Sequence, residues 1–151
     1  MGNERSFWID CVPPRSTHQS ALRIHRLKNG KQFVGRSSKG LKTDKMLQCL
    51  LYPFKPARPY QDAVEIRIKW VYPYRKSEPK KNRHAPIPCI TRPDADNILK
   101  GLIDAMTKVG FWKDDSLIFR ISFEKYFSCS SGIGVTIRTK SGIEPIQKNL
   151  I

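Results

Sequence analysis

The stretch Arg92-Pro93-Asp94-Ala95-Asp96-Asn97-Ile98-Leu99-Lys100 carries two aspartates directly before an amphipathic helix. A second acidic stretch, Lys113-Asp114-Asp115-Ser116, follows shortly downstream. Five of the 13 acidic residues fall in this region, although the chain has 28 Lys and Arg and a formal net charge of +15. Because neighbouring carboxylates repel one another unless a cation lies between them, the pattern indicates a metal site inside a basic protein.

The residues after the first two aspartates predict a helix. One apolar stripe at helical spacing consists of Leu99, Leu102, Ile103 and Met106. Asp96 or Asn97 is expected to cap the helix, and Gly110 to end it. Lys100 lies one turn beyond Asp96 and on the same side, within reach of the carboxylates or of a phosphate.

Two aromatic residues, Phe111 and Trp112, follow the helix and are expected to re-enter the core. They would carry Asp114 and Asp115 to the mouth of the next strand, back beside the start of the helix. Spacing alone leaves an alternative open, in which these aspartates form only a helix cap and a turn, since Asp is common in both roles.

The whole chain, residues 1–151, is expected to form one α+β domain. Its elements would follow the order β-α-β-α-β-β, in a mixed sheet of about four strands with two helices packed on one face. The expected strands cover residues 6–12, 63–72, 117–127 and 132–139, and the first helix residues 43–52. The strand at 63–72 alternates apolar and charged side chains, which is typical of a half-buried strand. The last two strands are expected to form an antiparallel hairpin.

Two basic segments, residues 23–45 and 73–88, are expected to be exposed loops, the first with a turn at Asn29-Gly30. Each is either a solvated, mobile segment or an arm that contacts phosphates, and composition does not decide between them. Tyr74 could stack on an unpaired base. The candidate nucleic-acid-binding residues are Arg75, Lys76, Lys80, Lys81, Arg83 and Arg92.

Composition narrows the function classes. A sequence pI near 10 indicates polyanionic partners, and nucleic acid is the commonest of these. No apolar run approaches the ~20 residues that span a bilayer, and the N-terminus lacks a secretion signal, so the protein is expected in the cytoplasm. The four cysteines have no paired spacing and are expected to be reduced, mostly core thiols. The three histidines are expected to be solvated and not metal ligands.

The motif formed by residues 92–97, Lys100 and residues 111–116 resembles the signature of the RusA family of Holliday junction resolvases of phages and prophages. The resemblance implies a RusA-like fold and a homodimer with two acidic sites on a basic surface. It also implies that Asp94, Asp96 and Asp115 bind metal, that Asp114 is an auxiliary acid, and that Lys100 is catalytic. The loop at 73–88 is long for the family, so its contacts with substrate do not carry over.

The function expected from this resemblance is structure-selective DNA cleavage. The enzyme would resolve four-way junctions by paired symmetric nicks in recombination and repair, in a bacterial cell or a phage-infected host. Mg²⁺ is the expected cofactor, because it prefers oxygen ligands and supports phosphodiester hydrolysis, and no organic cofactor is expected. Two alternatives explain the charge without catalysis: a basic DNA-binding protein of the recombination machinery, and a ribosome-associated or RNA-binding factor.

Overall fold

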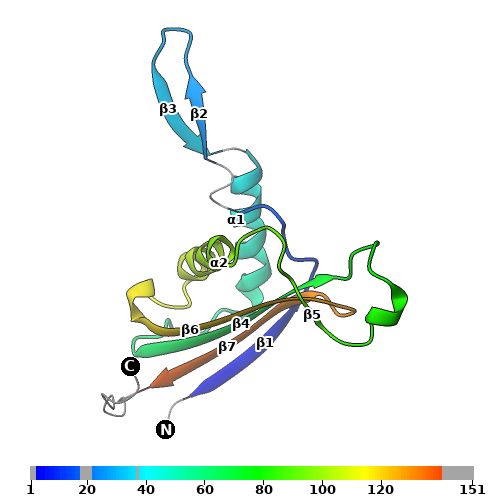
Figure 1. Ribbon diagram of the computed structural model, residues 1–151. Helices are drawn as coiled ribbons and strands as arrows, with labels where there is room; N and C mark the ends of the chain where they lie inside the picture. Colours follow the sequence, from blue (N-terminus) through cyan, green and yellow to red (C-terminus); the bar gives the residue numbers. More distant parts are fainter. Residues whose placement is uncertain (1–2, 18–21, 37, 141–151) are drawn as a thin grey trace, which may run out of the picture.

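The computed structural model describes residues 3–17, 22–36 and 38–140. It confirms an α+β fold in which a mixed five-stranded sheet carries both helices on one face (Figure 1). The helices are α1 (Ser38–Leu51) and α2 (Ala95–Val109). The strands of the sheet are β1 (Glu4–Asp10), β4 (Ala63–Pro73), β5 (Ile87–Pro88), β6 (Ile118–Ser128) and β7 (Gly132–Lys140). Three 3-10 turns complete the list: η2 (Tyr52–Phe54), η3 (Lys80–Asn82) and η4 (Asp115–Leu117).

The strand order is β1-β7-β4-β6-β5, with β4 and β6 parallel and the other neighbours antiparallel. The expected antiparallel hairpin of the last two strands is therefore wrong, because β4 lies between β6 and β7. The reason is burial. The β4 side chains Val64, Ile66, Ile68 and Trp70 are at most 1% exposed, and Val71 and Glu65 on the other face are buried too. A strand buried on both faces belongs in the interior of a sheet, flanked on both sides.

The segment expected to be the first basic loop instead contains a second, two-stranded sheet. Its strands are β2 (Leu22–Arg26) and β3 (Gln32–Arg36), paired antiparallel. The turn between them confirms the expectation for Asn29-Gly30: Gly30 adopts a positive φ of 81°, and the Asn29 side chain accepts a hydrogen bond from Lys31 N–H. The hairpin projects from the start of α1, away from the five-stranded sheet (Figure 1).

The helices pack on the sheet through the expected apolar positions. In α1, which begins at Ser38 instead of near Thr43, Leu47 and Leu51 are buried. The buried residues of α2 are Ile98, Leu102, Ile103, Ala105, Met106 and Val109, so the core-facing stripe is wider than expected. Gly110 ends α2 in the left-handed conformation, as expected. Phe111 and Trp112 are buried, as also expected.

The cysteines differ from the expectation of core thiols. Cys89 is buried and Cys11 half-buried, but Cys49 and Cys129 are exposed, and all four are free thiols. Among the described residues, no helix is long and apolar enough to cross a membrane.

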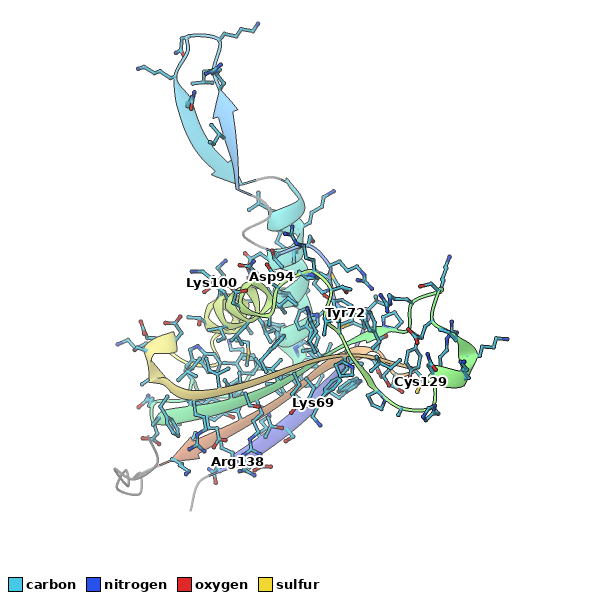
Figure 2. All side chains as sticks on the ribbon, viewed as in Figure 1. Lys69, Tyr72, Asp94, Lys100, Cys129 and Arg138 are labelled. Atoms are coloured by element: carbon cyan, nitrogen blue, oxygen red, sulfur yellow. The ribbon has the colours of Figure 1, made fainter. Side chains whose placement is uncertain are left out.

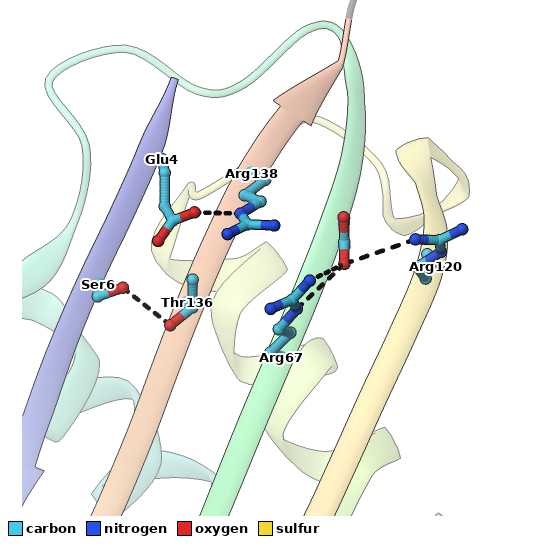
Figure 3. A network of polar contacts seen from close by, with 7 residues as sticks. Glu4, Ser6, Arg67, Arg120, Thr136 and Arg138 are labelled. Carbon is cyan, nitrogen blue, oxygen red and sulfur yellow. Dashed lines mark hydrogen bonds and ion pairs between the residues drawn. The ribbon is translucent and has the colours of Figure 1, made fainter. Parts of the chain in front are cut away.

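The sheet face opposite the helices carries a network of charged side chains (Figure 3). Glu65 is 3% exposed and accepts two hydrogen bonds from Arg67, and Arg120 lies 3.9 Å away. The hydrogen bonds from Arg67 lower the pKa of the Glu65 carboxyl, against the effect of burial, which raises it. Two further pairs cross from β1 to β7: Glu4 with Arg138, and Ser6 with Thr136.

Candidate active site

Asp94 occupies the N-cap position of α2. Its backbone is extended (φ −69°, ψ 146°), its carbonyl accepts the first helical bond from Ile98, and its side chain makes no capping hydrogen bond. The expectation that Asp96 or Asn97 caps the helix is therefore wrong, because both lie inside its first turn. Since the exposed Asp94 carboxylate is not used for capping, its oxygens remain available to a cation.

Lys125 of β6 fixes the segment that leads into Asp94. Its ammonium group donates hydrogen bonds of 2.7 Å to the carbonyls of Thr91 and Pro93. Its own carbonyl accepts a 2.9 Å bond from the N–H of Cys89. The sheet thus holds the chain immediately before the first aspartate at three points. Sequence reasoning missed Lys125, because a lysine in a strand carries no signal of such a contact.

Asp96 and Lys100 extend the exposed surface that begins at Asp94. Asp96 lies in the first turn of α2, where the helix dipole favours negative charge. Lys100 follows one turn later and is exposed. Figure 2 shows Asp94 and Lys100 on the part of α2 that faces away from the sheet. The structure therefore brings two carboxylates and one ammonium group of the motif to one accessible surface.

Asp114 and Asp115 lie at the other end of α2. The Trp112 indole N–H donates to Thr107 in the last turns of the helix, which keeps the returning chain at this end. At 15 residues, α2 is about 22 Å long, so its length separates these aspartates from Asp94. The structure thus does not show the expected return to the start of the helix. Figure 1 agrees, since η4 lies on the side of α2 away from the segment that enters it.

The two acids of η4 differ in their surroundings. Asp114 caps η4 by accepting a 2.8 Å hydrogen bond from Ser116 N–H, and the hydrogen bonds from Ser116 lower the pKa of its carboxyl. Asp115 is exposed at the first position of η4. Of this pair, Asp115 has the carboxylate that is free of local hydrogen bonds among the described residues.

The donor set suits a hard cation. Exposed aspartates with free oxygens are the ligands that Mg²⁺ prefers. Within the described part of one chain, no three His, Cys, Asp or Glu side chains gather into a metal-binding group. His84, the histidine whose side chain is described, is exposed in the loop before β5 and accepts or donates at Lys81 C=O. The pair Asp94 and Asp96 is therefore the part of a metal site that one chain provides.

The basic segment before β5 is an ordered loop. Arg83 holds it together by donating to the carbonyls of Arg75, Lys76 and Glu78, with a shortest distance of 2.7 Å. The Tyr74 hydroxyl donates to Ala85 within the same loop. Of the candidate nucleic-acid-binding residues, these contacts engage Arg83 inside the loop.

The remaining basic candidates are more accessible. Arg75 lies over the Phe127 ring at 5.0 Å and pairs with Glu78 at 3.6 Å. The exposed candidates with no printed side-chain partner are Lys76, Lys80, Lys81 and Arg92. Lys80 and Lys81 stand on η3, at the outer end of the loop in Figure 1.

Residues 12–138 match the protein family described as Endodeoxyribonuclease RusA. The chain belongs to the RusA family. It is also 28% identical over 125 residues to the crossover junction endodeoxyribonuclease RusA of Lactococcus phage r1t. That alignment covers 83% of this chain and 88% of the phage protein.

The RusA match spans all the elements from the β2–β3 hairpin to most of β7. Both acidic stretches, the ordered basic loop and Lys125 therefore lie inside the RusA region. The chain is thus an endodeoxyribonuclease-family protein whose exposed aspartates precede and follow one helix.

Proposed function

We propose that this protein is a Mg²⁺-dependent, structure-selective DNA endonuclease that resolves four-way junctions by paired symmetric nicks. It would act in recombination and repair, in the cytoplasm of a bacterial cell or phage-infected host. The observation that carries the proposal is the surface formed by Asp94, Asp96 and Lys100 at the start of α2, within a chain of the RusA family. The related phage protein is named for crossover junction cleavage, which supports this choice of substrate.

The proposed chemistry assigns a role to each group. Mg²⁺ would supply an activated water and neutralise charge on the phosphate. Asp94 and Asp96 would provide oxygen ligands, and Asp115 would complete the set, with Asp114 as an auxiliary acid. Lys100 would stabilise the negative charge that develops on the phosphate in the transition state. Lys125 positions Asp94 by holding the two carbonyls before it.

A homodimer is part of the proposal. Two symmetric cuts need two sites, and each chain has one Asp94–Asp96 pair. Two copies of a chain with a formal charge of +15 also offer a large basic surface to the four arms of a junction. The ordered basic loop and the β2–β3 hairpin are the projecting parts of that surface (Figure 1).

The decisive experiment incubates the purified protein with a mobile four-way junction and Mg²⁺ and maps the nicks on each strand. We expect paired cuts at symmetric positions, and loss of cutting with junction binding retained in Asp94→Asn. Asp104→Asn is the matched control, because Asp104 lies on the same helix and has no assigned role. Ca²⁺ should support binding but little cleavage, since its looser coordination sphere relaxes the reacting geometry.

Asp115→Asn tests the most separated member of the proposed set. Cleavage should fall by orders of magnitude, while DNA binding persists or tightens because one negative charge near the phosphate is lost. Cutting at the native rate would remove Asp115 from the site. Lys100→Ala should weaken cleavage without abolishing metal binding.

The high positive charge also favours a second candidate, a non-catalytic protein that binds DNA or RNA. Binding without cleavage under every metal condition would support that candidate and contradict the nuclease. Competition between junction DNA and structured RNA at fixed salt would then identify the preferred nucleic acid.

A further inference from the structure

Strand β6 has one paired edge and one largely open edge. Its inner edge pairs with β4 along ten positions, whereas β5 pairs only with Tyr126 and Phe127 on the outer edge. Cys89 N–H also reaches the outer edge, at the Lys125 carbonyl. In the described part of the chain, residues 119–124 have no strand beside them on that edge. Two large apolar side chains there are well exposed, Phe119 at 38% and Ile121 at 43%.

An open edge with exposed apolar side chains favours pairing with another strand. The hydrogen bond from Cys89 to Lys125 fixes which backbone groups face outward. Because outward-facing positions alternate along a strand, Ile121 and Phe123 also present their N–H and C=O groups to the open edge. An incoming antiparallel strand must align its own outward-facing residues with these two, which restricts the possible registers to steps of two residues.

We propose that β6 pairs antiparallel with β6 of a second copy of this chain, about a twofold axis at Ser122. Ile121 of each copy then exchanges two backbone hydrogen bonds with Phe123 of the other. Arg120 of each copy lies directly opposite Glu124 of the other, on the sheet face away from the helices. This inference deepens the homodimer of the proposed function and rests on it only for the existence of a twofold partner.

The charges along β6 select this register. Moving the axis by one residue to Ile121 or Phe123 places one charged residue, Arg120 or Glu124, opposite Ser122. Moving it by two places Arg120 opposite Arg120, or Glu124 opposite Glu124. Like charges directly opposite one another destabilise a strand pair, whereas opposite charges stabilise it. The axis at Ser122 is therefore the one register that pairs both charges of each copy.

The side chains in question are available for this pairing. The Arg120 side chain is 60% exposed, and its nearest carboxylate, that of Glu65, is at 3.9 Å (Figure 3). Glu124 accepts a 2.7 Å hydrogen bond from the Tyr126 hydroxyl and retains its other oxygen. On the helix face, contact with Phe123 of the other copy would cover the exposed Ile121. Identical surfaces that satisfy one another in this way give a closed dimer.

Cysteine cross-linking tests the register in the full-length protein. The background carries Cys49→Ser and Cys129→Ser, because these two native thiols are exposed. In that background, Ser122→Cys should form a disulfide-linked dimer on mild oxidation, since a directly opposed pair has Cβ atoms about 4.5–5.5 Å apart. Ser122 is exposed, so the substitution leaves the core unchanged. Arg120→Cys is the control, because its two copies would lie four residues apart along the strands.

A Ser122 cross-link at least about tenfold faster than the Arg120 cross-link is the expected result. Equal rates, or no Ser122 cross-link in a protein that is dimeric by mass, would overturn the register. A protein that is monomeric by light scattering at tens of micromolar (about the range where standard interfaces persist) would overturn the interface itself.

Glu124→Arg provides a second, non-covalent measurement. It sets two arginines opposite one another twice per dimer, so the dimer dissociation constant should rise by about tenfold or more. Thermal melting of the variant checks that the fold survives. An unchanged dissociation constant in a folded variant would refute the proposed contact. These tests use no DNA, so they can fail while junction cleavage is observed, and cleavage can fail while they succeed.

Discussion

Replacing Lys125 with Met removes the contact that fixes the chain before Asp94. Methionine keeps the length and the apolar stem of lysine but cannot donate to the carbonyls of Thr91 and Pro93. Because the stem still packs in β6, we expect the sheet to stay intact. The entry into α2, and with it the position of the Asp94 carboxylate, should become less well fixed.

The size of the effect follows from the two hydrogen bonds. Each is 2.7 Å long and charge-assisted, a class worth about 1.5–3 kcal/mol when buried. Lys125 is only half-buried, so water replaces part of that energy, and about 2 kcal/mol for both bonds together is a reasonable value. That free energy corresponds to a factor of about 30 in the population of the held conformation.

The assay compares junction cleavage at saturating Mg²⁺ with junction affinity in Ca²⁺. We expect Lys125→Met to lower the single-turnover cleavage rate by about ten- to thirtyfold with an affinity change of less than about threefold. Lys69→Met is the matched control, since Lys69 is an exposed lysine of the neighbouring β4 and its loss changes the net charge equally. A Lys125→Met variant that cleaves as fast as Lys69→Met would refute the positioning role.

Three other outcomes are expected. Because hydrogen bonding lowers the pKa of Glu65, its contribution to stability is full above the ordinary Glu pKa and is lost as pH falls towards the lowered value, so Glu65→Gln should flatten the acid side of a plot of melting temperature against pH. Neutralising Lys80 and Lys81 should reduce the salt dependence of DNA binding by about 0.9 in slope per lost phosphate contact, whereas Arg83→Ala should instead raise proteolysis of the loop that it holds. Gly110→Ala should cost about 1 kcal/mol in thermal unfolding, because Gly110 has a φ of 100°.

The sequence was sufficient wherever one local pattern determined the outcome. The stripe of α2, its end at Gly110 and the alternation of β4 all follow from side-chain periodicity and backbone freedom, and all are confirmed. The β2–β3 hairpin was missed because its many charges were read as a mobile loop, although the Asn29-Gly30 turn signal was present.

The remaining errors concern contacts between distant segments. The position of β4 between β6 and β7 depends on how the most buried strand is covered, which adjacent sequence does not report. The Lys125 contact joins residues more than thirty positions apart. The acid pair of η4 was expected beside Asp94, but the chain between them is fixed at the far end of α2 by Trp112. Such arrangements arise from packing and not from any local motif.

The antiparallel β6 pair has a consequence for the acids that α2 separates. Pairing about Ser122 runs the start of β6 in one copy, and η4 before it, towards the end of β6 in the other copy. There Lys125 holds the segment that enters Asp94. Asp115 of one copy would therefore lie on the same side of the dimer as Asp94 of the other, and each metal site would draw on both chains.

Mixing two inactive variants distinguishes this arrangement from a site within one chain. In a mixed dimer of Asp94→Asn and Asp115→Asn chains, a shared site pairs the intact Asp94 of one copy with the intact Asp115 of the other, so one of the two sites is restored. We expect such mixtures to nick junctions on one strand without the paired second cut. If each site belonged to a single chain, both sites of the mixed dimer would carry a defect, and the mixture would stay as inactive as either variant alone.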